Sequence, residues 1–379
     1  FAQMNRETYQ KSIFTDQRII AAHSQPVKID TEELVAEFNK LNLAPSHLSY
    51  IFHVAHCGST LLARALDLAS KNIVYREPFV LRQLSVLLAE NNWGDSPPDL
   101  WNQALRLSTS LLSKSYLSNA PVIIKANVPV NFAIDNLMTF SGDAKGLLLY
   151  TTFDNYLLSI LKSDNHRQWV STITTLLGKK IDSQIGLSLN ERQNLSIAQT
   201  AACLWLAQVS IFNAATQKYP DFKTLDSELF YSDPVPVLTA AFQLFGNEVS
   251  TEEIRSIAEG DLFSQHAKMP GQQYDNEQRL GEKKQLTQLI SGELREAREW
   301  LLTKIEDTAL PQYLLNPLIN ESPELVENLN ANAFSGHHQK QEKPANPVIN
   351  LKTEAPYLKI IRDKDDMCLD DIDDEIIIN

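Results

Sequence analysis

The stretch YIFHVAHCGSTLLARAL, residues 50–66, runs from an apolar segment through a glycine turn into an amphipathic pattern. A glycine at position 58 lets backbone N–H groups approach an anion closely, and a helix starting there points its positive end at the same place. Ser59 and Thr60 add hydroxyl groups that can contact the anion or cap the helix. The apolar positions then recur at helical spacing, at Leu61, Leu62, Ala65, Leu66 and Ala69. The stretch therefore predicts a strand, an anion-binding turn and a helix.

This turn differs from the nucleotide-phosphate loop G-x-x-x-x-G-K-[ST]. Only Gly58 is present, and no lysine follows it. The pattern therefore argues against an ordinary ATP or GTP site. An ordinary strand-to-helix turn, with glycine chosen for its conformation alone, stays an alternative for this stretch.

The rest of the chain alternates between short apolar runs and helical patterns. The predicted strands are 48–55, 72–77, 121–126 and 145–151. The predicted helices between them are about 60–70, 79–91, 99–117 and 129–140. After residue 190 helical patterns dominate, with one long helix over 191–220, a returning strand at 221–226 and a helix at 234–246. This order predicts an α/β fold, in which helices flank a parallel sheet and a helical second half packs on it.

The composition and charge of the chain argue against several classes of function. The chain has 379 residues, of which 43% are hydrophobic and 21% charged, and its net charge of −13 argues against nucleic-acid binding. No run of 18 apolar residues predicts a membrane span, and the first ten residues show no apolar signal core. The cysteines Cys57, Cys203 and Cys368 lie far apart in no metal or disulfide pattern, so we expect a cytoplasmic location.

Over about residues 48–280, the order of segments resembles the P-loop sulfotransferase family, closest in pattern to its bacterial and tyrosylprotein branch. That family's loop reads P-[RK]-S-G-[ST]-T. The matching stretch here is Ala55, His56, Cys57, Gly58, Ser59 and Thr60, with His56 in place of the family's cation and Cys57 in place of its serine. The resemblance implies that this loop binds the 5′-phosphosulfate of 3′-phosphoadenosine 5′-phosphosulfate (PAPS).

Two further matches follow the second and third strands. In YREP, Glu77 stands where that branch has its catalytic base, which takes the proton of an acceptor hydroxyl. In IIKANVP, Lys125 stands where the branch has a lysine that stabilises the transferring sulfonate, and it would supply the charge missing from the loop. The alternatives are an acid paired to Arg76 or Arg82, and a lysine that ends a strand in solvent.

The segment LLLYTTFDNYLLSILKS, which begins within the fourth run, resembles the family's 3′-phosphate segment. Ser159 matches its serine, but Thr151 occupies the position of its arginine. Loss of that arginine removes charged hydrogen bonds worth about 1.5–3 kcal/mol each. Candidate replacements are Lys162, Lys179 and Arg192.

The later segments are similar to the family in weaker ways. In FKTLDSELFYSDPVPVLTAAFQLFG, Asp226 stands in place of a tyrosine beside the nucleotide. HAKMPGQQYDNEQR, residues 266–279, resembles the basic loop that closes over the donor, with His266, Lys268 and Arg279 as its candidate residues.

The resemblance thus implies transfer of a sulfonyl group from PAPS to a hydroxyl or amine of a small-molecule or peptide acceptor. Glu77 and Lys125 would be catalytic, and the loop, Thr151, Ser159 and Lys268 would bind the donor. The alternatives are a P-loop phosphotransferase with another nucleotide donor and a non-catalytic binding protein that keeps the fold. We expect no metal, because His53, His56 and Cys57 have no second ligand cluster and the acidic tail has Cys368 where a calcium loop needs glycine.

We also predict a division of the chain into four parts. These are an N-terminal helical extension (1–45), a sulfotransferase-like P-loop domain (46–305), a polar linker (306–355) and an acidic tail (356–379).

Overall fold

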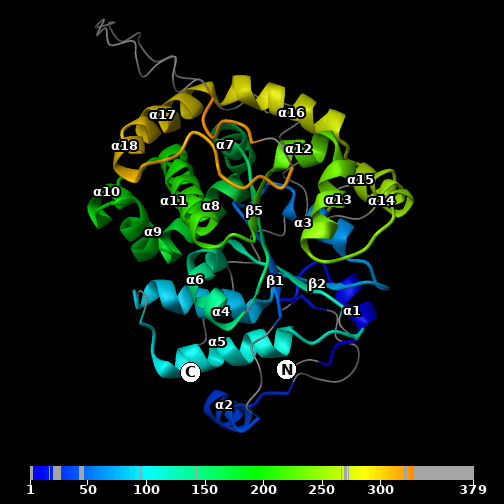
Figure 1. Cartoon of the computed structure of the whole chain (residues 1–379). Helices are drawn as coiled ribbons and strands as arrows, with labels where there is room; N and C mark the ends of the chain where they lie inside the picture. The colour runs from blue at the N-terminus through cyan, green and yellow to red at the C-terminus, as the bar shows by residue number, and fades with distance from the viewer. Residues whose placement is uncertain are drawn as a thin grey trace, which may run out of the picture.

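The computed structural model describes residues 3–16, 18–19, 27–41, 47–93, 96–118, 120–141, 143–265, 267–268, 271, 273–319 and 322–327. Within them, the predicted apolar runs form one parallel sheet with the strand order β2-β3-β1-β4-β5 (Figure 1). The strands are β1 (Ser49–His53), β2 (Ile73–Arg76), β3 (Val122–Lys125), β4 (Gly146–Tyr150) and β5 (Phe222–Asp226). Each overlaps a predicted strand, so the α/β class is confirmed.

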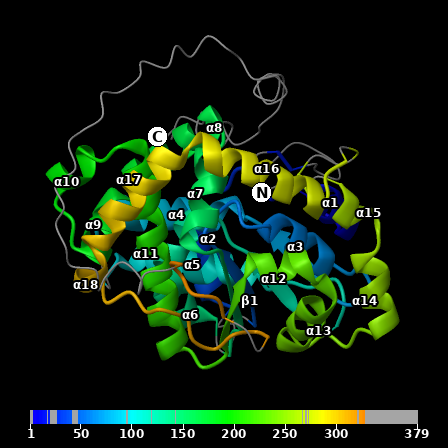
Figure 2. The same ribbon diagram turned by 90° about the horizontal axis from the view of Figure 1, so that it is seen from above.

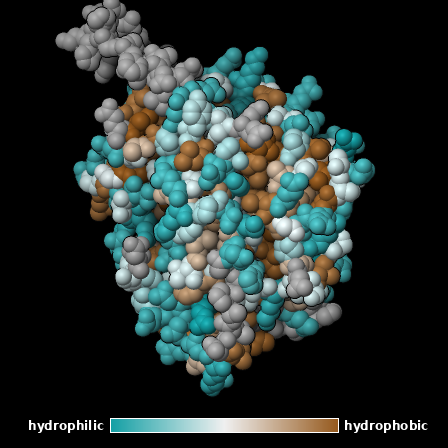
Figure 3. Space-filling view, in the orientation of Figure 1, coloured by the Kyte–Doolittle hydropathy of each residue, from teal (hydrophilic) through white to brown (hydrophobic). Residues whose placement is uncertain are grey.

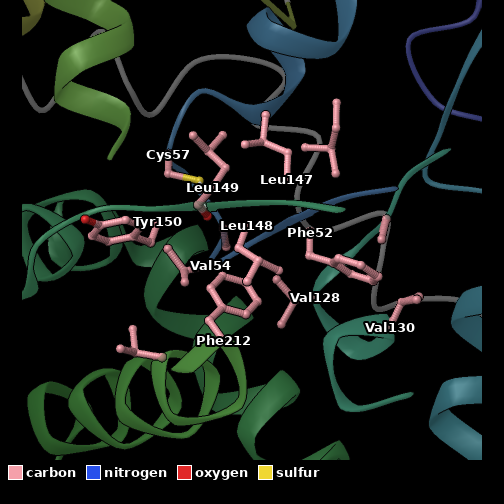
Figure 4. Packing of buried hydrophobic residues seen from close by; sticks show 14 of the residues in the cluster. Phe52, Val54, Cys57, Val128, Val130, Leu147, Leu148, Leu149, Tyr150 and Phe212 are labelled. Carbon is pink, nitrogen blue, oxygen red and sulfur yellow. Dashed lines mark hydrogen bonds between the residues drawn. The ribbon is translucent and has the colours of Figure 1, made fainter. Parts of the chain in front are cut away.

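The sheet is buried on both faces, which is why its strands are almost continuously apolar. Every residue of β2, β3 and β4 is buried. Successive side chains of β4 alternate between the faces: Leu147 and Leu149 point to the side of Cys57, whereas Leu148 points to the side of Phe212 (Figure 4).

Helices cover the two faces in the order that right-handed crossovers require. One face carries α3 (Ser59–Leu66), α12 (Ser227–Ser232), α13 (Pro234–Leu244), α14 (Thr251–Ala258) and α15 (Asp261–Ser264) (Figures 1 and 2). The other carries α4 (Phe79–Glu90), α5 (Asp99–Leu112), η1 (Val128–Ala133), α6 (Ile134–Phe140), α7 (Phe153–Leu161), α8 (Asp164–Leu176), α9 (Gly178–Ile185) and α11 (Ile197–Lys218).

Six further helices complete the described chain. They are α1 (Arg6–Lys11), α2 (Thr31–Asn39), α10 (Leu189–Gln193), α16 (Asn276–Leu289), α17 (Ser291–Leu302) and α18 (Ile305–Thr308). Hydrophilic side chains cover much of the face seen in Figure 3, with hydrophobic side chains exposed between them.

Helix α11 is the central helix of the second half. It contacts α7, α8, α9 and α17. By length and composition it is apolar enough to cross a membrane, and no other described helix is, but 61% of its apolar window is buried inside the fold. The single helix expected over 191–220 is wrong: a capping box between Ser196 and Gln199 starts α11 at Ile197, after the separate helix α10.

The strand order brings the candidate loop to a topological switch point. From β1 the chain crosses to β2, and from β4 it crosses to β5 in the opposite direction along the sheet. Ligands of open α/β sheets bind where two such connections diverge, beyond the carboxyl ends of the strands. The turn after β1 lies at this place.

The division of the chain into four parts stays a prediction. Within it, residues that we expected to begin a polar linker contact the sheet and the core. Thr224 of β5 exchanges backbone hydrogen bonds with Asn316 and Leu318, and Leu325, which accepts a hydrogen bond from the amide of Phe153, is buried. The expected linker beyond residue 327 and the acidic tail lie outside the described residues.

Candidate functional site

The turn between β1 and α3 has a backbone conformation that residues with a side chain rarely adopt. Ala55 (φ 74°), His56 (φ 48°) and Gly58 (φ 77°) all lie in the left-handed region. Residues other than glycine pay a steric cost there, and such conformations collect at ligand-binding sites. The turn is therefore held in shape by its surroundings.

Glycine is required at position 58 for two reasons. Its φ is positive, and a β-carbon added to it would lie 2.5 Å from the phenol oxygen of Tyr231, on α12. Arg279 stacks over the ring of Tyr231, with 4.1 Å between the guanidinium carbon and the ring centroid, and pairs with both carboxylate oxygens of Glu228 at 2.8 and 2.9 Å. This second strand-to-helix segment thus lies directly against the turn.

The turn offers unused hydrogen-bond donors. Among the described residues, no backbone carbonyl accepts a hydrogen bond from the amides of residues 56–60, which precede or begin α3. The side chains of Ser59 and Thr60 are buried beside these amides. Free amides at a helix N-terminus form a site for an oxyanion. Cys57 contributes no nucleophile, because burial raises the pKa of its thiol to about 12 and its Sγ faces the carbonyl of Leu149.

The sheet register brings Lys125 to this turn. Ile51, Lys125 and Arg76 are paired across β1, β3 and β2, so their side chains share one face. His53 lies on the same face, two residues farther along β1. That face carries α3, so the carboxyl ends of β1 and β3 direct their side chains toward the start of this helix.

Lys125 forms an ion pair with Glu77, the residue after β2. Its ammonium contacts Oε1 of Glu77, and its side chain is almost fully buried, whereas 15% of the Glu77 side chain is exposed. Burial lowers the pKa of Lys125, and the contact with Glu77 acts in the opposite direction. Glu77 itself has a positive φ of 56°, another strained position at the site. Arg76 pairs with Asp67 at 2.9 Å rather than with Glu77, which contacts Lys125.

The N-terminal segment forms one wall of the site. Arg76 donates hydrogen bonds to the carbonyls of Tyr9, Ser12 and Ile13 and so fixes this segment against the end of β2. The ring of Phe14, which follows, lies 5.6 Å from Nζ of Lys125 and 5.8 Å from Nζ of Lys268. The structure therefore brings Lys268 close to Lys125 and places one aromatic ring against both ammonium groups.

His56 belongs to a cluster of rings. Its centroid lies 3.9 Å from that of His166 and 5.2 Å from that of Trp169, both on α8. Burial lowers the pKa of His56 well below its usual range, and the nearby His166, Lys268 and Lys162 lower it further. The ring is therefore neutral in this state and does not carry the fixed charge of the family's loop cation.

Ser159 reaches this cluster through its backbone. Its carbonyl accepts a hydrogen bond from Nδ1 of His166 at 2.9 Å, while its hydroxyl donates to the carbonyl of Asn155 within α7. Thr151 is buried at the end of β4, and its carbonyl accepts a hydrogen bond from the indole of Trp205. The Thr151 side chain supplies no cation in place of the arginine.

Of the candidate replacements, Lys162 acts on the site. It depresses the pKa of both His56 and His166. Lys179 instead contacts the carbonyl of Glu90, and Arg192 pairs with Asp182 at 2.7 Å. His266 lies outside the described residues.

Asp226 ends β5 and is buried. One carboxylate oxygen accepts the amide of Glu228 at 2.6 Å, and the other has no hydrogen-bond partner among the described residues. Burial raises the pKa of Asp226 to about 7. Among the described residues, no group of three or more His, Cys, Asp or Glu side chains is placed to hold a metal ion.

Sequence reasoning missed Phe14, His166 and Tyr231. Each comes from an element far from the loop in the chain. Phe14 and His166 lie in no motif, whereas Tyr231 lies in the segment 222–246, in which only Asp226 was singled out. His53 was noticed only as a possible metal ligand, although its position two residues before the strained turn was a usable signal.

No protein-family model matches the sequence. No curated protein matches it either. Among solved structures, a sulfotransferase domain from the curacin biosynthetic pathway is 12% identical with a TM-score of 0.40, covering 65% of this chain and 98% of that chain. A sulfotransferase from Alicyclobacillus acidocaldarius is 14% identical with a TM-score of 0.32, covering 69% of this chain and 97% of that chain. Likenesses this distant say nothing of the chemistry at the site.

Proposed function

We propose that this chain is a sulfotransferase-like enzyme that transfers a sulfonyl group from PAPS to a hydroxyl or amine acceptor. The observation that carries the proposal is the buried Lys125–Glu77 pair beside a strained turn whose amides donate to no described backbone carbonyl. One member is a cation for a transferring anionic group, and the other is a carboxylate for the acceptor's proton. This combination supplies both requirements of sulfonyl transfer without a metal ion.

The donor side of the site is formed by the turn. The amides of residues 56–60, with Ser59 and Thr60, hold the 5′-phosphosulfate at the start of α3. We assign the second phosphate to His56, Ser159 and Lys268. Neither Thr151 nor Cys57 has a side chain that supplies a charge. Both residues therefore contribute only to the shape of the donor site and through their backbone groups.

The chemistry needs one proton transfer and one exchange of bonds at sulfur. When bound, PAPS supplies a sulfonyl group that is activated by its bond to phosphate. Glu77 accepts the proton of the acceptor as the acceptor's oxygen or nitrogen bonds to sulfur. Lys125 moves its ammonium from Glu77 toward the bridging oxygen, which leaves with the electrons of the broken sulfur–oxygen bond as part of 3′,5′-ADP. Phe14 covers Lys125 and Lys268 and excludes water from this reaction.

Calorimetric titration with 3′,5′-ADP, 5′-AMP and Mg-ATP tests the proposal. Preference for 3′,5′-ADP supports PAPS as the donor. Preference for Mg-ATP would instead indicate a phosphotransferase. Binding of none of the three would indicate a binding protein that has kept the fold. Transfer from radiolabelled PAPS to a panel of phenols, sugars, amines and tyrosine peptides then identifies the acceptor class.

A cytoplasmic location is part of the proposal. It is supported by Cys57 and Cys203, which are both free and buried. Cys368 lies outside the described residues.

A further inference from the structure

His53 is a buried imidazole whose two nitrogens face different parts of the site. The residue is 5% exposed and ends β1, directly before the strained turn. Its Nδ1 lies 3.0 Å from the amide nitrogen of Ala55, which has φ 74°. Because an amide can only donate, Nδ1 is the acceptor of this hydrogen bond. In the neutral ring, the proton therefore lies on Nε2.

The Nε2–H group has no hydrogen-bond partner among the described residues, although it is buried. The charged atom that it faces is Oε1 of Glu77, 4.0 Å away. Burial lowers the pKa of His53 well below its usual range, and Lys125 and Lys268 lower it further, whereas the Ala126 carbonyl raises it. The ring is therefore neutral at neutral pH, and Nε2 remains a donor.

We propose that His53 is a positioning residue that couples the oxyanion turn to Glu77, an inference that rests on the proposed function. In the described state, Lys125 holds Oε1 of Glu77. When Lys125 turns toward the transferring group, Glu77 loses this donor. His53 Nε2–H then donates to the same carboxylate and keeps it oriented toward the acceptor.

The same ring fixes the turn through Nδ1, so one side chain sets the distance between the donor site and the base. Its surroundings support this rigid role. Asn131 donates to the His53 carbonyl at 2.9 Å and to Oε1 of Gln208 at 2.8 Å, and all three side chains are buried. The end of β1 is thus held from the opposite side by two amides.

Two substitutions separate the functions of the ring nitrogens. His53→Asn keeps an acceptor near the position of Nδ1 and removes the Nε2 donor. It is expected to bind 3′,5′-ADP within about twofold of the wild type while kcat falls about 10- to 100-fold. His53→Gln keeps a donor near the position of Nε2 and removes the acceptor, so it is expected to lose at least about tenfold in 3′,5′-ADP affinity and to retain more of kcat at saturating PAPS. Equal loss of both quantities in both variants, or wild-type kcat in His53→Asn, overturns the proposal.

Nitrogen NMR of the full chain with ¹⁵N-labelled histidine tests the same arrangement without turnover. The expected His53 signals are those of an unprotonated Nδ1 and a protonated Nε2. Glu77→Gln is expected to change the chemical shift of Nε2 with little effect on that of Nδ1. A protonated Nδ1, or an Nε2 signal indifferent to Glu77→Gln, overturns the proposal whatever the donor is. If the wild type neither binds 3′,5′-ADP nor transfers from PAPS, the proposed function fails, and the NMR result still decides the His53 coupling.

Discussion

The phenol of Tyr231 lies against the α-carbon of Gly58 so closely that a single methyl group on the glycine would come within 2.5 Å of the phenol oxygen. The start of α3, where the oxyanion is expected, is therefore packed by a side chain that follows β5. The position of Tyr231 is in turn fixed by Arg279 and Glu228. The segments that follow β1 and β5 thus meet at Gly58.

Gly58→Ala is expected to destabilise the fold and to weaken anion binding. The left-handed backbone alone costs roughly 1–2 kcal/mol for a residue with a β-carbon, and the contact with Tyr231 adds to it. We expect 3′,5′-ADP affinity to fall at least about tenfold in calorimetry, because the loop amides shift with the backbone. Gly186→Ala is the matched control, since Gly186 has φ 68° and open space around the added carbon. It should show the backbone cost with unchanged binding; equal binding by Gly58→Ala and the wild type would contradict the assignment of the turn.

Glu77 and Lys125 are expected to be coupled in stability as well as in catalysis. Glu77→Gln leaves a buried ammonium without its partner, which typically costs about 3–5 kcal/mol. Lys125→Met costs less, because part of the Glu77 carboxylate reaches solvent. The double variant removes both charges and should regain most of the lost stability in denaturant unfolding.

Activity separates this pair from a purely structural one. Lys125→Met is expected to lower kcat roughly 10²- to 10³-fold, and Glu77→Gln roughly 10²- to 10⁴-fold. The double variant should be no more active than either single one, although it is more stable than Glu77→Gln. Recovery of activity together with stability would mean that the pair serves folding alone.

Site residues that a local sequence pattern places could be predicted, whereas residues that distant packing places could not. Lys125 and Glu77 end neighbouring parallel strands, so an apolar run followed by a charged residue was enough to bring them to one edge of the sheet. Phe14 could not be placed in this way, because its position depends on the hydrogen bonds that Arg76 makes to the carbonyls before it. His166 likewise depends on how α8 packs beside the turn, which no local pattern encodes. Buried contacts between distant elements are set by packing of the whole domain rather than by periodicity.

Anion binding is expected to strengthen as the pH falls. The pKa values of His56 and His166 are lowered, first by burial and then by surrounding cations, which include Lys162 and Lys268 for both rings. An oxyanion beside them raises these values, so binding takes up protons. The affinity for 3′,5′-ADP should therefore rise from pH 8 to pH 6, by up to about tenfold per pH unit for each proton taken up.

Calorimetry in buffers of different ionisation enthalpy measures this proton uptake directly. The proton uptake should decrease in His166→Asn, whose amide can still donate to the Ser159 carbonyl from near the position of Nδ1 but cannot be charged. The same histidines also predict how the stability of the free protein depends on pH. Because the folded state keeps them neutral, the free energy of unfolding should fall as the pH drops below about 6.5. Binding that is independent of pH, without proton uptake, would show that the rings do not contact the anion.

Asp226→Asn is expected to stabilise the protein more at alkaline than at acidic pH. The pKa of Asp226 is raised from 3.8 to about 7 by burial, so the folded state holds a proton that the unfolded state releases between these values. This contribution is complete below pH 3.8 and is lost as pH rises to about 7, whereas asparagine stays neutral and still accepts the Glu228 amide as the cap of α12. The gain over the wild type in unfolding free energy should be on the order of 3 kcal/mol larger at pH 8 than at pH 5. Asp275→Asn, at the exposed cap of α16, is the matched control and should show no such difference; an equal gain for Asp226→Asn at both pH values would show that the carboxylate is already charged in the fold.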